Sequence, residues 1–282
     1  MQLVDALAEL YLRAATQLPR DVEAALREAA KREDGVAKAS LEMILENIKI
    51  AREEGRPICQ DTGTPIFYVE RPAAMSEREL RAAILEATRR ATKEIPLRSN
   101  SVDSLGGKNS GNNIHSGVPI IHFKEGERLR FQLLLKGGGS ENSGGTYTLP
   151  NELGGRDLKG AAACVLDLVR KAQGKGCPPG ILGICIGSPK ELVVQNSLRQ
   201  FLRPLNERNA VPELQKFEDS LTAEINSTGI GPMGFGGKTT VLGVRACALS
   251  RHPASYFVDI SYSCWALRRA GLEFGDGGAK FD

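Results

Sequence analysis

Four polar, glycine-rich segments interrupt the sequence, and each lies beside a stretch that is predicted to be a strand. They are CQDTGT (59–64), the stretch 97–113, KGGGSENSGG (136–145) and NSTGIGPMGFGGKT (226–239). Glycine makes up 31 of the 282 residues and clusters in these loops, which suggests backbone that is brought close to something. Because sites are usually built from loops on a rigid scaffold, the pattern favours a site assembled from these segments.

The segment GIGPMGFGGKTT (229–240) has some features of a phosphate-binding loop, but its spacing is wrong. A Walker A loop needs a glycine, four residues, and then Gly-Lys-Ser/Thr. The Gly-Lys-Thr end is present at 237–239, but the leading position is Pro232. Such a loop should also open a helix, whereas the following TTVLGVRACAL (239–249) is a β-branched apolar run typical of a strand. We therefore interpret the segment as a glycine-rich approach to a strand.

Composition excludes several classes of function. With 41% hydrophobic and 25% charged residues, the chain has the composition of an ordinary globular protein. A net charge of +3 without a long basic run argues against nucleic acid as a partner, and 5% aromatics argue against base stacking. The N-terminal stretch has neither signal-peptide nor transit-peptide character, and no apolar run approaches 18 residues. We expect a cytoplasmic protein with no membrane span.

Apolar periodicity and capping residues predict a mixture of helices and strands without regular βαβ alternation. Asp21 is expected to cap a second helix after a break at Pro19, Ser40 to open another, and Ser188 to cap a helix whose first residue is Pro189. The predicted helices cover 3–18, 21–31, 40 onward, 76–94, 157–173, 188 onward and 211–226. The predicted strands cover 65–69, 118–123, 129–137, 181–187, 239–249 and 255–263.

The six cysteines divide by context. A chain expected in the cytoplasm does not use its cysteines as a disulfide framework. The absence of a CxxC pair argues against a zinc ribbon. Three lie in apolar runs and are expected to be plain core residues: Cys164, Cys185 and Cys247. Three lie at element ends beside Pro, Gly or polar residues, where a reactive or ligating thiol needs to be: Cys59, Cys177 and Cys264. Spacing alone does not show that these three meet.

Six blocks in the same order resemble the α-subunit, or N-terminal catalytic domain, of the class I iron–sulfur hydro-lyases. That family comprises class I fumarases and L(+)-tartrate dehydratases. The blocks are PICQDTGTPIFYV, PLRSNSVDSLGGKNSGNN, LLKGGGSENSG, GKGCPPGILGICIG, NSTGIGPMGFGGKTTVLGV and RHPASYFVDISYSCWALRRA. They extend from about residue 57 to 270, which is most of the chain. The resemblance implies an α+β (mixed α/β) fold with helices packed around small β-sheets, and a single catalytic domain over 1–282.

The resemblance also implies a [4Fe–4S] cluster with three cysteine ligands, at the matching positions Cys59, Cys177 and Cys264. Three protein ligands leave one iron open, and an open iron can act as a Lewis acid on a hydroxyl and a carboxylate of the substrate.

The matching substrate contacts are Gln60 and Asp61, which are also the catalytic candidates, Arg98 as a carboxylate clamp, and a backbone N–H in 137–139, best placed at Gly138. From the residues alone, Arg98 could equally be a solvated loop charge, and Asp61 could form an Asx turn before Gly63.

The activity implied by the resemblance is the reversible hydration of fumarate to (S)-malate. The alternative is L(+)-tartrate dehydratase, which gives oxaloacetate. HPASYFVDISYSCW (252–265) looks more like the fumarase type. Two other classes are a redox iron–sulfur protein, which would want a fourth cysteine ligand, and a non-catalytic assembly subunit.

In single-chain members a C-terminal domain supplies the general base and further carboxylate-binding groups. The present sequence ends at GGAKFD, so we expect a separate β-subunit, an α2β2 assembly, and no activity of this chain alone.

The remaining polar residues give weaker indications. His122 is expected to be a packed strand residue, and His252 to lie in a loop or at a subunit contact. His115, Lys238 and Asn109 are candidates for lying near the site, with no assigned role.

Overall fold

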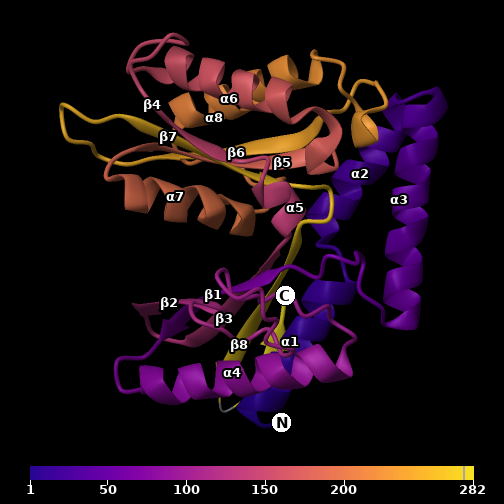
Figure 1. The fold of residues 1–282 in the computed structure, drawn as a ribbon, viewed down its shortest axis with the longest axis vertical. Helices are drawn as coiled ribbons and strands as arrows, with labels where there is room; N and C mark the ends of the chain where they lie inside the picture. Colours follow the sequence, from indigo (N-terminus) through magenta and orange to yellow (C-terminus); the bar gives the residue numbers. More distant parts are fainter. Residues whose placement is uncertain (276) are drawn as a thin grey trace. The chain divides into compact units, whose positions relative to one another are not determined.

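The computed structural model describes residues 1–275 and 277–282, and the chain divides into two compact units. The first unit comprises Met1–Pro19, Glu46–Gly138 and Arg268–Asp282, and the second comprises Arg20–Leu45 and Gly139–Leu267. Both units combine helices with a small mixed β-sheet (Figure 1), so the predicted mixed α/β class is confirmed. Among the described residues, no helix combines the length and the apolar character that crossing a bilayer requires.

The sheet of the first unit has the strand order β2-β1-β3-β8-β9. Its strands are β1 (Thr64–Arg71), β2 (Ile120–Glu125), β3 (Leu129–Lys136), β8 (Arg268–Gly275) and β9 (Gly278–Phe281). Only the β1–β2 pairing is parallel among these described strands. One face of this sheet packs on α1 (Leu3–Thr16) and α4 (Glu77–Glu94), because the alternate apolar side chains of β1 and β3 form one core with the apolar stripes of both helices.

The sheet of the second unit has the strand order β4-β7-β5-β6. Its strands are β4 (Gly145–Thr148), β5 (Gly180–Gly187), β6 (Val241–Ala248) and β7 (Phe257–Ser263). In Figure 1, α6 (Leu158–Ala172) and α8 (Pro212–Asn226) cover one face of this sheet, and α7 (Lys190–Arg199) covers the other. Because β5 is buried on both faces, it reads in the sequence as a continuous apolar run rather than an alternating one.

The pairing of β1 with β3 positions two of the glycine-rich loops at one edge of the first sheet. The strands are antiparallel with Thr64 opposite Lys136, so the segment that precedes β1 meets the segment that follows β3. Gly63 makes this meeting possible. It has φ +88°, and a Cβ at this position would lie 2.7 Å from the carbonyl carbon of Leu135. A residue with a side chain would therefore be both strained and too close to the backbone of β3.

Two predicted helix starts are wrong. The second helix, α2 (Arg20–Arg32), begins before Asp21, whose carboxylate accepts a hydrogen bond from the Leu205 N–H at 2.8 Å. Asp21 thus lies in the first turn, where a negative charge still suits the helix dipole, and it is not the cap. Helix α3 (Gly35–Glu54) begins five residues before Ser40, whose hydroxyl donates to the Val36 carbonyl inside the helix.

The predicted cap of α7 is also wrong in detail. Pro189 is the N-cap residue, and the helix begins at Lys190. The hydroxyl of Ser188 accepts a hydrogen bond from the His252 N–H at 2.9 Å, so it connects two loops and does not cap the helix. The other predicted elements are confirmed to within a few residues. The strands β4, β8 and β9 were not predicted.

Candidate functional site

A surface depression of about 440 Å³ in the first unit collects several of the residues that the sequence analysis singled out. Its lining consists of Arg56, Pro57, Cys59, Gln60, Thr62, Pro96 and Arg98. Two segments about forty residues apart, the CQDTGT loop and the start of the 97–113 stretch, therefore share one wall.

The backbone in front of Cys59 is fixed by the first unit. The Ile58 N–H donates to the carbonyl of Ala15 at 2.9 Å, and the Ile58 carbonyl accepts from the side-chain amide of Asn47 at 2.9 Å. The Ile58 side chain is buried. These contacts hold Cys59 half-buried at the rim of the depression and leave Gln60 exposed beside it.

The two carboxylate oxygens of Asp61 have different surroundings. Its Oδ1 accepts a hydrogen bond from the Gly63 N–H at 3.1 Å, so the Asx turn considered in the sequence analysis is present. A Cβ built on Gly138 would lie 4.0 Å from Oδ2, its nearest neighbour, which places this oxygen beside the glycine loop that follows β3. The Asp61 carbonyl accepts a hydrogen bond from the guanidinium of Arg268.

Arg268 and Lys136 are buried cations of the first unit, and the sequence analysis gave neither a role. Arg268 is 2% exposed and Lys136 is 3% exposed. The Nε of Arg268 has no hydrogen-bond partner within the described residues, and the Nζ of Lys136 donates to the carbonyl of Gly137 at 3.2 Å. The only signal in the sequence was the position of Arg268 inside the block that contains Cys264.

The backbone of Arg98 is anchored while its side chain is exposed. The carbonyl of Arg98 accepts hydrogen bonds from the Thr62 hydroxyl at 3.2 Å and from the Asn113 side-chain amide at 3.1 Å. Asn109, a candidate for the site, instead builds the loop: it donates to the Ser99 carbonyl at 2.9 Å and accepts from the Ser99 hydroxyl at 2.6 Å. The guanidinium of Arg98 therefore lines the depression from a fixed backbone.

Two of the predicted ligating cysteines lie in one neighbourhood of the second unit. The Trp265 N–H donates to the carbonyl of Cys177 at 3.4 Å, which joins the Cys177 loop to the residues that follow β7. The buried Tyr262 packs against the same loop, because a Cβ on Gly176 would lie 2.4 Å from its ring. Burial, with added contributions from the Cys264 and Cys177 thiols, raises the pKa of Tyr262. Cys177 is exposed and Cys264 is half-buried.

Cys59 belongs to the first unit, and Cys177 and Cys264 belong to the second. Within the described part of the chain, no group of three or more His, Cys, Asp or Glu side chains stands together as an ion-binding set. A shared cluster with these three ligands thus stays a prediction.

The cysteines expected in the core behave in two ways. Cys164 and Cys185 are fully buried, as predicted. Cys247 is half-buried, so its description as a plain core residue is wrong. The reason is that β6 is an edge strand of the second sheet, and the end of an edge strand is open to solvent.

Lys238 has a structural environment. Its ammonium donates to the carboxylate of Asp34 and to the carbonyl of Arg32, both at 2.8 Å, and its N–H donates to the carboxylate of Glu33. It thereby fixes the glycine-rich loop to the end of α2.

The histidines also have defined positions. His122 stacks on Tyr68 with ring centroids 5.0 Å apart, which confirms a packed strand residue. The His252 Nδ1 accepts a hydrogen bond from the Ala254 N–H in a loop, and the backbone of His115 pairs with that of Val118.

The protein is thus of the mixed α/β class, with a loop-built depression that gathers a thiol, a carboxamide and a guanidinium and has a carboxylate on the same loop. Comparison with known proteins is consistent with that class. The sequence profile of the family described as fumarate hydratase (fumerase) matches residues 4–273. The chain therefore belongs to the class I fumarate hydratase family, which confirms the resemblance seen in the sequence.

Three relatives illustrate what the chain is similar to within that family. A protein of Geobacillus stearothermophilus, provisionally named fumarate hydratase class I, is 41% identical over 280 residues, which is 96% of this chain and 54% of the relative. A protein of Methanocaldococcus jannaschii, provisionally named L(+)-tartrate dehydratase subunit alpha, is 37% identical over 278 residues, 96% of each chain. The L(+)-tartrate dehydratase subunit alpha of Escherichia coli is 30% identical over 277 residues, 96% of this chain and 90% of the relative. The chain thus spans about half of the first relative and nearly all of the other two.

Proposed function

We propose that the chain is the α-type catalytic part of a [4Fe–4S]-dependent hydro-lyase that reversibly hydrates fumarate to (S)-malate. The observation that carries the proposal is the depression that gathers Cys59, Gln60 and Arg98 beside Asp61. A thiol and a guanidinium in one loop-built hollow, with a carboxylate on the same loop, suit a small dicarboxylic acid held next to a metal centre.

The donor set fits such a cluster in its chemistry. Thiolates are the usual ligands of iron–sulfur clusters, and a ligating sulfur must be reachable from outside the core. Cys59, Cys177 and Cys264 are exposed or half-buried in loops with anchored backbones, whereas Cys164 and Cys185 are fully buried. The iron that lacks a protein ligand would supply Lewis acidity toward the hydroxyl and carboxylate of the substrate.

The chain's own residues would orient the substrate. The planar guanidinium of Arg98 is suited to two parallel hydrogen bonds with a carboxylate. The N–H of Gly138 is a further donor, and a Cβ at this position would meet no atom nearer than the Asp61 Oδ2 at 4.0 Å, so the backbone there is open to a ligand. Gln60 and the Oδ2 of Asp61 would contact the reacting end of the substrate and act as its catalytic residues.

A separate β-subunit, an α2β2 assembly and a cytoplasmic location complete the proposal. Two relatives that the chain matches over 96% and 90% of their length carry the name subunit alpha, which supports a partner chain. The partner would supply the general base and further groups that bind the distal carboxylate.

L(+)-tartrate dehydration is the second candidate, because the relatives matched over nearly their whole length are named for it. Assays with fumarate, (S)-malate and L(+)-tartrate, on the chain combined with its β-subunit, separate the two. A kcat/KM for tartrate above that for malate would replace the leading assignment.

Anaerobic electron paramagnetic resonance on the reconstituted chain tests the cluster itself. We expect a [4Fe–4S] form that loses one iron on mild oxidation and gives a [3Fe–4S] signal. Cys59→Ala should abolish the cluster, while the matched control Cys164→Ala, at a fully buried thiol, should keep it. A cluster that resists iron loss would indicate a fourth protein ligand and electron transfer, and a chain that takes up no iron would refute the proposal.

A further inference from the structure

Two thiols that the proposed hydro-lyase chemistry does not use lie side by side on adjacent strands of the second sheet. Cys185 of β5 and Cys247 of β6 are register partners in the parallel β5–β6 pair. Neighbouring strands lie about 4.7–4.9 Å apart, which is inside the range of Cα separations that a disulfide bridges. As register partners on adjacent strands, the two residues carry their side chains on the same face of the sheet. The spacing of the two strands thus permits a disulfide at this register pair without a change of register.

The two thiols differ in access. Cys185 is fully buried in the interior strand of the sheet, between β7 and β6. Cys247 lies near the end of the edge strand β6 and is half-buried, with its sulfur 3.9 Å from the carbonyl of Asn196 in α7. A small oxidant can therefore reach Cys247 first, and Cys185 only through Cys247.

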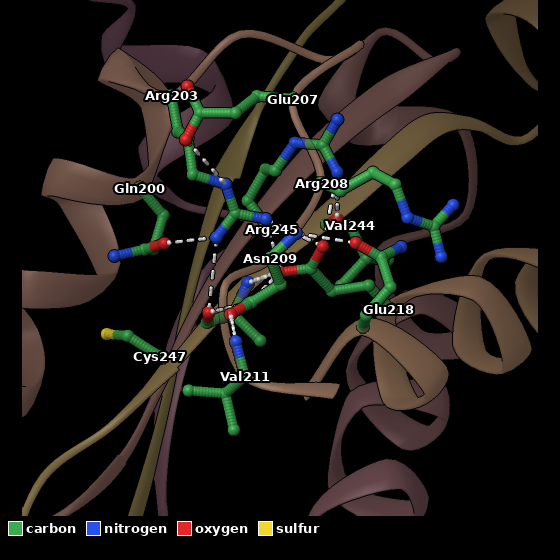
Figure 2. A network of polar contacts seen from close by, with 12 residues as sticks. Gln200, Arg203, Glu207, Arg208, Asn209, Val211, Glu218, Val244, Arg245 and Cys247 are labelled. Carbon is green, nitrogen blue, oxygen red and sulfur yellow. Dashed lines mark hydrogen bonds and ion pairs between the residues drawn. The ribbon is translucent and has the colours of Figure 1, made fainter. Parts of the chain in front are cut away.

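The charges around the pair favour the thiolate on Cys247. The pKa of Cys247 is lowered by the neighbouring Cys185 thiol and by the guanidinium groups of Arg203 and Arg199, which together outweigh the opposing effects of burial and of the Glu218 carboxylate. Arg203 is held by a buried carboxylate, that of Glu218, at 2.5 and 2.6 Å (Figure 2). The same thiol–thiol contact and burial raise the pKa of Cys185, with a smaller contribution from the carboxylate of Asp259.

A partly accessible thiolate beside a protonated second thiol is the arrangement found in thiol-based peroxide sensors. We propose that Cys247 and Cys185 form a peroxide-responsive dithiol. Hydrogen peroxide transfers one OH group to the Cys247 thiolate sulfur, which becomes a sulfenic acid as the O–O bond breaks and hydroxide leaves. The Cys185 sulfur then attacks the Cys247 sulfur, its proton leaves with the sulfenic hydroxyl as water, and a Cys185–Cys247 disulfide forms. The two thiols lose two electrons, which the peroxide accepts.

This modification site is independent of the proposed hydro-lyase activity, because neither thiol lines the Cys59 depression or belongs to the predicted cluster ligands. The inference about this dithiol holds equally if the chain acts on tartrate or binds no cluster.

Peptide mapping of the full-length chain tests the inference directly. The anaerobically reduced protein is treated with limiting hydrogen peroxide, alkylated, digested with trypsin and analysed by mass spectrometry. Peptide 176–190 carries Cys177 as well as Cys185, so fragment ions must assign the bond between this peptide and peptide 246–251. We expect a cross-link at Cys185–Cys247 in the wild-type chain, reversed by dithiothreitol.

Single variants test the order of events. Cys185→Ser should leave a sulfenic acid on Cys247 that dimedone captures, and Cys247→Ser should leave Cys185 reduced. The control Cys164→Ser, at a fully buried thiol of α6, should leave the cross-link unchanged. The wild-type measurement stands even if a variant fails to fold. Complete alkylation of both thiols after peroxide, or a cross-link at Cys177 in place of Cys185, would overturn the proposal.

Discussion

The buried carboxylate of Glu218 offers the sharpest test of how the second unit is held together. Its side chain is 1% exposed and accepts hydrogen bonds from the guanidinium groups of Arg203 and Arg245, the side-chain amide of Asn209 and the N–H of Ala246 (Figure 2). These donors come from the 200–211 segment and from β6, so one residue of α8 joins both to the helix. Glu218→Gln keeps the size of the side chain and removes its charge.

The expected cost follows from the donors that remain. Arg245 is 6% exposed and would lose its counter-ion in a buried position, and the largely buried Arg203 would keep only the exposed Glu207, 4.0 Å away. Removing one partner of a buried ion pair typically costs about 3–5 kcal/mol, because the other charge stays buried. For a unit of this size, 1 kcal/mol corresponds to roughly 2–4 °C in Tm. Glu218→Gln should therefore lower the Tm of the second unit by about 6–20 °C.

Urea and thermal unfolding, followed by circular dichroism, measure this loss. Glu28→Gln is the matched control, since Glu28 pairs with Lys31 at 2.6 Å on the surface, with side chains 61% and 70% exposed. An exposed pair contributes about 0–1 kcal/mol, so this control should change Tm little. Equal effects of the two substitutions would refute the view that burial of Glu218 makes its charge indispensable.

Three further predictions concern pH, the glycine loops and the carboxylate clamp. Burial raises the pKa of Asp259, so the folded chain keeps a proton that the unfolded chain releases, and stability falls as pH rises from about 4 through the folded pKa. Urea unfolding at a series of pH values measures the free energy of unfolding as a function of pH. Asp259→Asn should reduce its fall above about pH 4, and an unchanged pH dependence would contradict this prediction. Gly63→Ala should destabilise the fold by at least about 1–2 kcal/mol, whereas Gly138→Ala should leave stability unchanged and lower activity. Arg98→Lys should raise the KM for the substrate about tenfold and leave the electron paramagnetic resonance signal of the cluster unchanged, because an ammonium cannot form the two parallel hydrogen bonds of a guanidinium. An unchanged KM would show that Arg98 does not bind the substrate.

Apolar periodicity predicted the elements whose burial is regular. Helices α6 and α8 and the strand β5 appear close to their predicted bounds, because their apolar faces are set by local spacing. The start of α3 was missed because Ser40 resembles a cap in sequence, yet its hydroxyl can equally bond to a carbonyl inside the helix. Residues that suit a cap do not by themselves end a helix.

The unpredicted strands have little strand character of their own. β8, RRAGLEFG, contains two arginines, a glutamate and two glycines, and it becomes a strand because residues 268–274 pair with β3. β4 is four residues long and pairs with β7. Tertiary pairing overrides local preference in both, which no single-sequence pattern can reveal.

The sequence predicted which loops contribute to the candidate site, but not how these loops are arranged in space. Context alone separated Cys59 and Cys177 from the fully buried thiols Cys164 and Cys185. That the segment before β1 meets the segment after β3 depends on an antiparallel register, and Arg268, which donates to the Asp61 carbonyl, comes from an unpredicted strand.

The glycine clusters that first indicated a site have two different physical causes. At Gly63 and Gly176 a Cβ would meet the chain itself, at the backbone of Leu135 and the ring of Tyr262, so these glycines serve packing. At Gly138 the nearest neighbour of a Cβ is 4.0 Å away. Packing therefore does not require glycine at position 138, whereas a ligand that approaches the backbone closely would require it. A high glycine content is therefore evidence for a site only at positions where the folded chain leaves the space empty, and opposite effects of alanine on stability and on activity distinguish the two causes.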